Sequence, residues 1–151
     1  MDIFIRNATK EDLKELVLLS AELAEYNSHN SNERSKFFME NWQHHFQEET
    51  LEFLQKRDSI SLVALFNNKI VGLIYAFYSA DTSYCYIEEL IVSQGHRGNK
   101  VGEKLLIAAE EFCKKYDVPI KIEVYSWNKS AISFYSKHGY IDEGVVLEKT
   151  L

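Results

Sequence analysis

Hydrophobic and polar positions follow two different periods along this chain, and each period predicts one kind of secondary structure. Apolar residues at helical spacing predict helices over residues 10–26, 101–116 and 129–138. Short runs rich in apolar residues predict strands over residues 2–6, 60–66, 69–78, 83–92, 120–125 and 140–149. The stretch 27–57 is polar but carries aromatic residues, among them Phe37 and Phe38, and we interpret it as one or two helices.

The order of these elements predicts the fold class. Asn67-Asn68 separates two predicted strands and is typical of a tight hairpin turn. Hairpins therefore fill the first half of the chain, whereas strands alternate with helices in the second half. We expect an α/β fold with a mixed, mostly antiparallel central sheet and helices on both faces. Because no internal repeat or linker rich in proline and glycine interrupts the chain, we interpret residues 1–151 as a single domain.

Composition argues against several functional classes. The formal net charge of −6 argues against general nucleic-acid binding, which needs a basic face, and is compatible with a cationic substrate. Cys85 and Cys113 lie in different predicted elements, so they indicate neither a disulfide framework nor a metal site. No apolar run approaches the ~18 residues of a membrane span, and the first residues lack the pattern of a secretory signal. We therefore expect a cytoplasmic protein that contacts neither membranes nor nucleic acid and holds no metal.

Residues 93–102, between a predicted strand and a predicted helix, carry the main chemical signal. They read Ser-Gln-Gly-His-Arg-Gly-Asn-Lys-Val-Gly. Gly98 and Gly102 allow a sharp turn and a close approach of the backbone to a ligand, while Arg97 and Lys100 add positive charge. Because the free amides at the start of a helix bind anions, this loop fits a pyrophosphate.

Two familiar phosphate-binding motifs do not match this loop. The nucleoside-triphosphate loop requires Gly-x-x-x-x-Gly-Lys-Ser/Thr, but a lysine and a glutamate stand five positions after Gly95 and Gly98. The dinucleotide fingerprint Gly-x-Gly-x-x-Gly is absent as well. Two alternatives stay open: an ordinary strand-to-helix turn with solvated basic residues, and a nucleotide-binding regulator that uses the same loop.

Two motifs at matching separation resemble the core of the GNAT superfamily of acetyl-CoA-dependent N-acetyltransferases. Leu90-Ile91-Val92 is similar to the strand end of that family. The run from Arg97 to Gly102 is similar to its loop Arg/Gln-x-x-Gly-x-Gly/Ala, with Lys100 in place of the first glycine. The second cofactor-binding segment of the family is similar to Ile122-Glu123-Val124, Asn128, Ala131, Phe134-Tyr135 and Gly139.

This resemblance implies a sheet geometry and an acyl donor. The sheet would have six to seven strands, splayed at the centre, where acetyl-CoA would lie. The backbone of Leu90 and Val92 would bind the pantetheine arm, and the backbone near Leu90 and Ile91 would polarise the thioester carbonyl. Asn128 would also bind the arm, unless it only caps the following helix or does both. The pyrophosphate would be held by the amides of Arg97, Gly98, Asn99, Lys100, Val101 and Gly102.

Two residues are candidates for proton transfer. Tyr135 matches the usual general acid of the family, which protonates the departing thiolate; the alternative is an aromatic residue of the core. Glu88 is our candidate for the base that deprotonates the attacking ammonium; the alternative is a partly solvated glutamate. Alternation along a strand would place Glu88 on the face of Leu90 and Val92, and a bulge would exchange its role with that of Glu89.

The acceptor is the least defined part of the prediction. Tyr86-Ile87-Glu88-Glu89 and Trp127-Asn128 resemble polyamine N-acetyltransferases, which favours a small amine or polyamine that attacks directly in a ternary complex. Protein N-termini or lysines as acceptors, and a non-catalytic acyl-CoA-binding module, are the alternatives. The reaction needs neither a cysteine nucleophile nor a metal, and a homodimer would be in keeping with the family.

Overall fold

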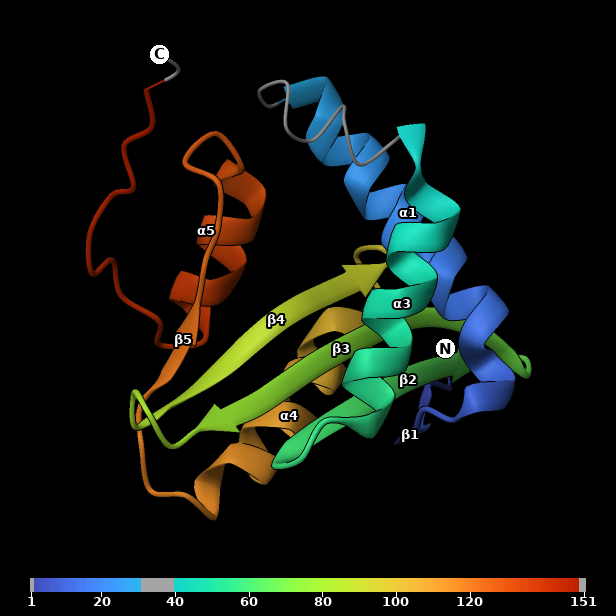
Figure 1. Ribbon diagram of the computed structural model, residues 1–151, viewed down its shortest axis with the longest axis horizontal. Helices are drawn as coiled ribbons and strands as arrows, with labels where there is room; N and C mark the ends of the chain where they lie inside the picture. Colours follow the sequence, from blue (N-terminus) through green and yellow to red (C-terminus); the bar gives the residue numbers. More distant parts are fainter. Residues whose placement is uncertain (1, 31–39, 150–151) are drawn as a thin grey trace.

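Five strands of the described chain form one sheet in the order β1-β2-β3-β4-β5 (Figure 1). The structure is a computed structural model that describes residues 2–30 and 40–149. The strands β1 to β4 pair antiparallel with their neighbours, and β5 pairs parallel to β4. The predicted α/β class with a mixed, mostly antiparallel sheet is confirmed. The strands are β1 (Phe4–Asn7), β2 (Ser59–Phe66), β3 (Lys69–Ser79), β4 (Tyr84–Val92) and β5 (Ile120–Ile122).

Helices cover both faces of this sheet (Figure 1). One face carries α1 (Leu13–Asn30), which follows the short 3-10 helix η1 (Lys10–Asp12), and α3 (Trp42–Gln55). The other face carries α4 (Val101–Lys114), and α5 (Lys129–Lys137) comes after β5. The predicted helical stretch 27–57 thus holds the end of α1 and the whole of α3, while Phe37 and Phe38 lie outside the described residues. No helix in the described ranges has the length and apolar character that a bilayer crossing requires.

Alternate strand residues face two separate apolar clusters, as pleated strands require. The inner sides of α1 and α3 pack on Val63, Leu73, Tyr75 and Ile91. The inner side of α4 packs on Leu62, Ala64, Ile74, Ala76, Cys85 and Ile87. Cys85 and Cys113 are both buried free thiols in this second cluster, which agrees with the absence of a disulfide framework in the sequence.

Gly72 sets the distance between β3 and α4. A Cβ atom at this position would lie 2.9 Å from the carbonyl oxygen of Ile91 and about 3.1 Å from the side chain of Leu105. Only a residue without a side chain allows so close an approach. The contact fixes the first turns of α4 against the end of β4, where the phosphate-binding loop is predicted.

The strand predicted near residues 140–149 is absent, so this prediction was wrong. After Gly139, which has a φ of +88°, the hydroxyl of Tyr140 donates a hydrogen bond of 3.0 Å to Glu110 on α4. The chain then runs away from β5 without a partner strand in the described chain, and Ile141 and Leu147 are 80% and 91% exposed. Because a strand needs a partner for its backbone groups, the apolar pattern alone does not produce one, and the sheet has five strands rather than six to seven.

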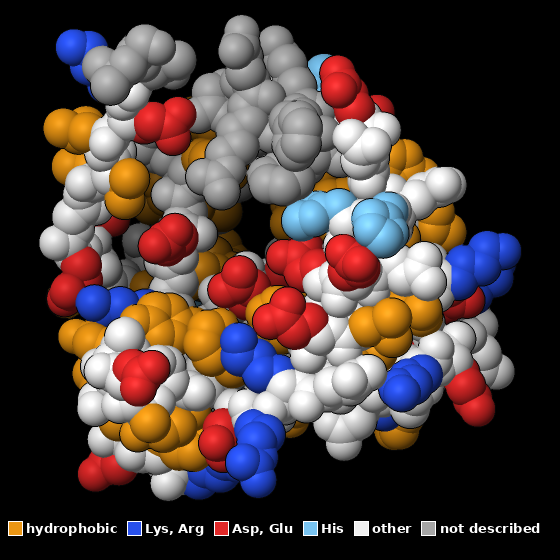
Figure 2. Space-filling view, in the orientation of Figure 1, with side chains coloured by type: hydrophobic (Ala, Val, Ile, Leu, Met, Phe, Trp, Pro, Cys, Tyr) orange, Lys and Arg blue, Asp and Glu red, His pale blue; other side chains and the backbone are white. Residues whose placement is uncertain are grey.

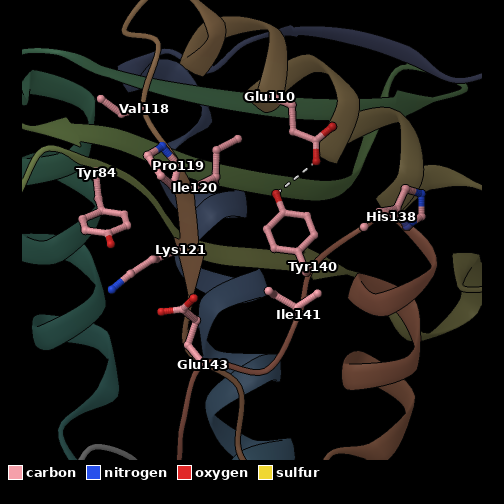
Figure 3. Close-up of a pocket in the computed structure, with 11 residues that line it drawn as sticks. Tyr84, Glu110, Val118, Pro119, Ile120, Lys121, His138, Tyr140, Ile141 and Glu143 are labelled. Carbon is pink, nitrogen blue, oxygen red and sulfur yellow. Dashed lines mark hydrogen bonds between the residues drawn. The ribbon is translucent and has the colours of Figure 1, made fainter.

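A cavity of about 490 Å³ separates β5 from this C-terminal segment (Figure 3). Lys121 points toward Tyr84 on one side of the cavity, with its ammonium 3.9 Å from the ring centroid. Ile141 and Glu143 line the other side. The cavity lies at the outer edge of the sheet, away from the loop that opens α4.

Candidate active site

The strands β4 and β5 are the last two strands of the sheet, and they diverge there rather than at the centre, where the opening was predicted (Figure 1). They pair only from Cys85 with Ile120 to Ile87 with Ile122. Beyond Ile87, β4 pairs with β3 on one side and with no described strand on the other. The backbone of Leu90 and Val92 therefore borders the predicted opening in the sheet. The strand predicted over residues 120–125 ends early because the chain turns away from β4.

The loop after β4, where an anion site is predicted, turns sharply and leaves open space beside its backbone. Gly98 has a φ of +78°, and a Cβ atom there would meet nothing within 4 Å, so the space beside it is open. Lys100 is the N-cap of α4 and has a φ of 61°, a left-handed conformation that favours glycine. This observation explains why the resembling family has a glycine here. The amides of the first turn of α4 have no acceptor within the helix, which leaves them free for an anion.

The side chain of Arg97 is anchored to the end of β4 and to α1. Its Nε donates a hydrogen bond of 3.0 Å to the carbonyl of Val92, and its guanidinium lies 3.7 Å from the Glu22 carboxylate. The guanidinium also lies over the ring of Tyr26, 5.6 Å from its centroid. Glu22 in turn accepts a hydrogen bond of 2.9 Å from the Gln94 amide. Sequence reasoning missed Glu22 because nothing in its local pattern indicates a contact with a loop so distant in sequence.

Asn128 caps α5, as one of the two predicted roles requires. Its Oδ1 accepts hydrogen bonds of 3.2 Å from the Ala131 amide and 3.1 Å from the Ser130 hydroxyl. The cap uses only the oxygen, so the side-chain NH₂ is still a donor that could reach a ligand. The predicted contact with the pantetheine arm stays a prediction.

The two motifs that resemble the family meet in space. A Cβ atom at Gly102, in the first turn of α4, would lie 3.6 Å from the ring of Phe134 and 3.6 Å from Val92. Phe134 comes from α5, so α5 lies beside the first turn of α4 and the end of β4. The two motifs were predicted to be two halves of one site, and in the structure their residues Gly102 and Phe134 lie in contact.

Tyr135 lies in the cluster beneath α4 and α5 and is only 7% exposed. Its ring packs edge-to-face on Phe134 and Tyr140, with centroid distances of 5.1 and 5.5 Å. Burial raises the pKa of its hydroxyl above the ordinary range, so the phenol stays protonated. Both the acid role and the core role are compatible with this position, and the acid role stays a prediction.

A β-bulge at Glu88 changes the face assignment made from the sequence. Tyr75 pairs with Glu89 and Ala76 pairs with Ile87, so Glu88 is an extra residue on β4. Because a bulge interrupts the alternation of side chains, Ile87 shares the α4 face with Leu90. The prediction that Glu88 shares the face of Leu90 and Val92 was wrong. Glu88 is exposed. Its charge acts on Glu49 of α3, which covers the sheet face opposite to α4.

Glu89 occupies the more enclosed position. It lies on the face of α1 and α3, is partly buried, and accepts a hydrogen bond of 3.1 Å from the Ser20 hydroxyl. Burial raises the pKa of Glu89 to about 8, the negative charge of Glu49 adds to the rise, and the Ser20 hydrogen bond opposes it. A carboxyl group with this pKa can exchange a proton near neutral pH, which is the property a general base needs.

Comparisons with known proteins agree with this geometry. The family model described as "Acetyltransferase (GNAT) family" matches residues 28–140. A tetramutant protein from Bacillus halodurans superposes with a TM-score of 0.84 at 25% identity, covering 98% of this chain and 99% of the other. No curated protein sequence matches the chain.

Two further solved structures contain ligands. The Thermoplasma acidophilum PaiA N-acetyltransferase in complex with coenzyme A has a TM-score of 0.75 at 24% identity, covering 91% of this chain and 89% of the other. An aminoglycoside acetyltransferase from an uncultured soil metagenomic sample, in complex with sisomicin, has a TM-score of 0.71 at 19% identity. That superposition covers 99% of this chain and 96% of the other.

Proposed function

Because the chain belongs to the GNAT family of acetyltransferases, we propose that it acetylates a primary amine of a small molecule or polyamine by direct attack. The chain is an N-acetyltransferase whose acyl donor is acetyl-CoA. The acceptor and the roles of individual residues belong to the proposal. Two similar structures are named as an N-acetyltransferase with coenzyme A and an aminoglycoside acetyltransferase with sisomicin, which supports a small amine as acceptor.

The divergence of β4 and β5 beside the first turn of α4 is the observation that carries this proposal. A coenzyme A thioester has a diphosphate at one end and an extended arm at the other. The amides from Gly98 to Gly102 fit the diphosphate, because they are helix-start donors with open space beside Gly98. The free edge of β4 at Leu90 and Val92 fits the arm, because amide groups of an arm can pair with a strand edge.

Glu89 is our proposed base, in the role first predicted for Glu88. A primary ammonium must lose a proton before its nitrogen can attack a carbonyl carbon. Glu89 lies one residue before Leu90, where the thioester carbonyl is expected, and it has a raised pKa. The water-exposed Glu88 would attract the ammonium to the site by its charge.

Tyr135 is our proposed acid. The amine nitrogen forms a bond to the carbonyl carbon, the bond from carbon to sulfur breaks, and the thiolate accepts the phenolic proton of Tyr135. Glu89 takes one proton of the ammonium before the attack, directly or through water, and the second proton that the nitrogen loses as the amide forms restores the phenol of Tyr135 through water. Cys85 and Cys113 are buried and take no part.

An amine screen with detection of free coenzyme A thiol tests this function. We expect thiol release that depends on acetyl-CoA and on a small primary amine, and calorimetry should detect coenzyme A binding. Thiol release with peptides but with no small amine would favour a protein acceptor. Binding without release, across a broad panel of amines and peptides, would favour a non-catalytic binding module. If ATP competes well with coenzyme A in a thermal-shift assay, a nucleotide-binding regulator would be favoured.

A further inference from the structure

Three carboxylates gather between β4 and α3, on the face opposite to α4. They belong to Glu49, Glu88 and Glu89. Figure 2 shows acidic side chains at the centre of this face, over the end of β4 and the adjoining side of α3. Burial raises the pKa of both Glu49 and Glu89. The charge of Glu88 adds to the rise at Glu49, which His45 opposes, and the charges of Glu49 and Glu88 add to the rise at Glu89.

No lysine or arginine of the described ranges forms an ion pair with these three carboxylates. Among the described residues, the basic neighbour is His45, whose Nε2 lies 3.8 Å from Glu49 on the same helix. Both side chains are near two-fifths exposed, at 38% and 40%. Carboxylates held close together repel each other, so a cationic group at this place would relieve a repulsion that the described lysines and arginines do not offset.

Tyr75 gives a second and independent observation at this place. It pairs with Glu89 across β3 and β4 and is only 1% exposed. Its buried hydroxyl makes no hydrogen bond of good geometry within the described part of the chain, although Thr50 is near enough to lower its pKa. Stacking on Phe53, with centroids 4.8 Å apart, holds the ring in place, and Glu89 and Glu49 are close enough to influence the same pKa.

An unpaired buried hydroxyl is costly, so its presence calls for an explanation. A neutral carboxyl group needs fewer donors than an ionised one, which accepts hydrogen bonds only. Ser20 already donates to Glu89. If a cation binds, both Glu49 and Glu89 ionise. The Tyr75 hydroxyl can then donate a hydrogen bond to the carboxylate of Glu49.

We propose that Glu49, positioned by Tyr75, binds a second ammonium group of the acceptor while the reacting amine lies at Glu89. The acceptor is then a diamine or polyamine rather than a simple monoamine. This inference rests on the proposed function, because it places the reacting amine at Glu89. Tyr75 acts through the carboxylates and is a positioning residue.

Diaminobutane and butylamine, which differ by one amine, test this subsite. Glu49→Gln should lower kcat/KM for diaminobutane about tenfold, equivalent to about 1.4 kcal/mol. The same variant should change kcat/KM for butylamine less than about twofold. The matched control is Glu48→Gln, since Glu48 is the exposed neighbour on the same helix and faces His44. It should leave both values unchanged. Equal losses with both amines, or no loss in Glu49→Gln, would overturn the proposal.

Tyr75→Phe keeps the stacked ring and removes only the hydroxyl. Because that hydroxyl makes no hydrogen bond of good geometry in the free protein, we expect Tm to stay within about 2 °C of wild type or to rise. KM for diaminobutane should rise several-fold while kcat holds. A lower Tm with an unchanged KM would show a purely structural role and would contradict the proposal.

A failure of the proposed function would look different from a failure of the subsite. If the wild-type protein binds coenzyme A but acetylates no amine of the broad panel, the proposed function fails. Calorimetry with diaminobutane and the coenzyme A complex then tests the subsite directly. Binding that Glu49→Gln weakens about tenfold and Glu48→Gln does not would support it, and an absence of binding to wild type would overturn it.

Discussion

Glu89 lies directly opposite Tyr75 in the pairing of β3 with β4, where a regular register would place Glu88. The extra residue in the bulge brings a carboxyl group beneath α1 and α3, beside Ser20 and Glu49. It also leaves the Leu90 side chain on the α4 face and the free edge of β4 beside the opening in the sheet. One inserted residue therefore places Glu89, rather than Glu88, in the enclosed position.

The raised pKa of Glu89 predicts a pH-dependent cost to stability. The pKa is about 8 in the folded protein against an ordinary value of 4.5. Between these values the folded state binds a proton that the unfolded state has lost, so the free energy of unfolding decreases as pH rises. Among the described residues, Glu49, Glu88 and the hydroxyls of Ser20 and Tyr75 act on Glu89, and none of them supplies positive charge.

Replacing this carboxyl group by an amide should therefore stabilise the protein at alkaline pH. Thermal melts of Glu89→Gln and wild type should nearly coincide at pH 5, and the variant should melt about 3 °C higher or more at pH 8. Glu88→Gln, one residue away and exposed, is the control and should show no such divergence. A constant difference between pH 5 and pH 8 would contradict the raised pKa.

The same two variants decide which glutamate is the base. Glu89→Gln should lower kcat about a hundredfold, within the usual range for a general base, and should abolish the rise of the rate through about pH 8. Glu88→Gln should raise KM for a cationic amine and leave kcat within about threefold. The opposite pattern in steady-state kinetics would return the role to Glu88.

Lys100 predicts a stabilising substitution, because its φ of 61° is unfavourable for a residue with a side chain. Lys100→Gly should raise the free energy of unfolding by about 0.5–1 kcal/mol, since glycine adopts this conformation without strain but loses more entropy on folding. The variant should also bind coenzyme A a few-fold less tightly at low salt. Lys100→Ala is the matched control. It removes the charge and keeps the strain, so it should weaken binding equally without raising Tm.

The sequence predicted the parts of the fold that local patterns determine. Asn67 and Asn68 both adopt the positive φ that their hairpin turn requires, and the apolar period of α4 matches its buried face. The glycines of the loop after β4 predicted a sharp turn there, and Gly98 has a φ of +78°; phosphate binding by this loop stays a prediction. All of these features depend on neighbours within a few positions.

The features that the sequence did not predict depend on contacts between distant elements. The bulge at Glu88 is visible only in the pairing of β4 with β3, and the contact of Glu22 with Gln94 joins α1 to the loop after β4. Val146 lies in an apolar run typical of a strand, yet it is 89% exposed because no partner strand is present in the described chain. Hydrophobic periodicity indicates which residues can be buried, but it does not indicate which other element will pack on them.

Asn128 offers a test that separates capping from ligand binding. Asn128→Asp keeps an oxygen for the Ala131 amide and removes the NH₂ donor, so stability should change by less than about 0.5 kcal/mol. Asn128→Ala removes both and should cost about 1 kcal/mol. If the NH₂ group binds the pantetheine arm, both variants should weaken coenzyme A binding in calorimetry. Weaker binding in the alanine variant alone would assign Asn128 to the cap.

Tyr135→Phe tests whether the buried phenol is an acid or a core residue. The substitution keeps the ring contacts with Phe134 and Tyr140, so Tm and coenzyme A affinity should be nearly unchanged. If the hydroxyl protonates the departing thiolate, kcat should fall about a hundredfold. Because thiols with a low pKa need no such proton, an acetyl donor with a more acidic leaving group should restore much of the lost rate.

The control for this prediction is Tyr140→Phe, which removes a hydroxyl that contacts Glu110 in the same cluster. That variant should lose about 1 kcal/mol of stability with its hydrogen bond and keep its kcat. If both variants lower kcat by the same factor, the effect comes from the packing of the cluster. If Tyr135→Phe retains full kcat, water or another group supplies the proton and Tyr135 is a residue of the core.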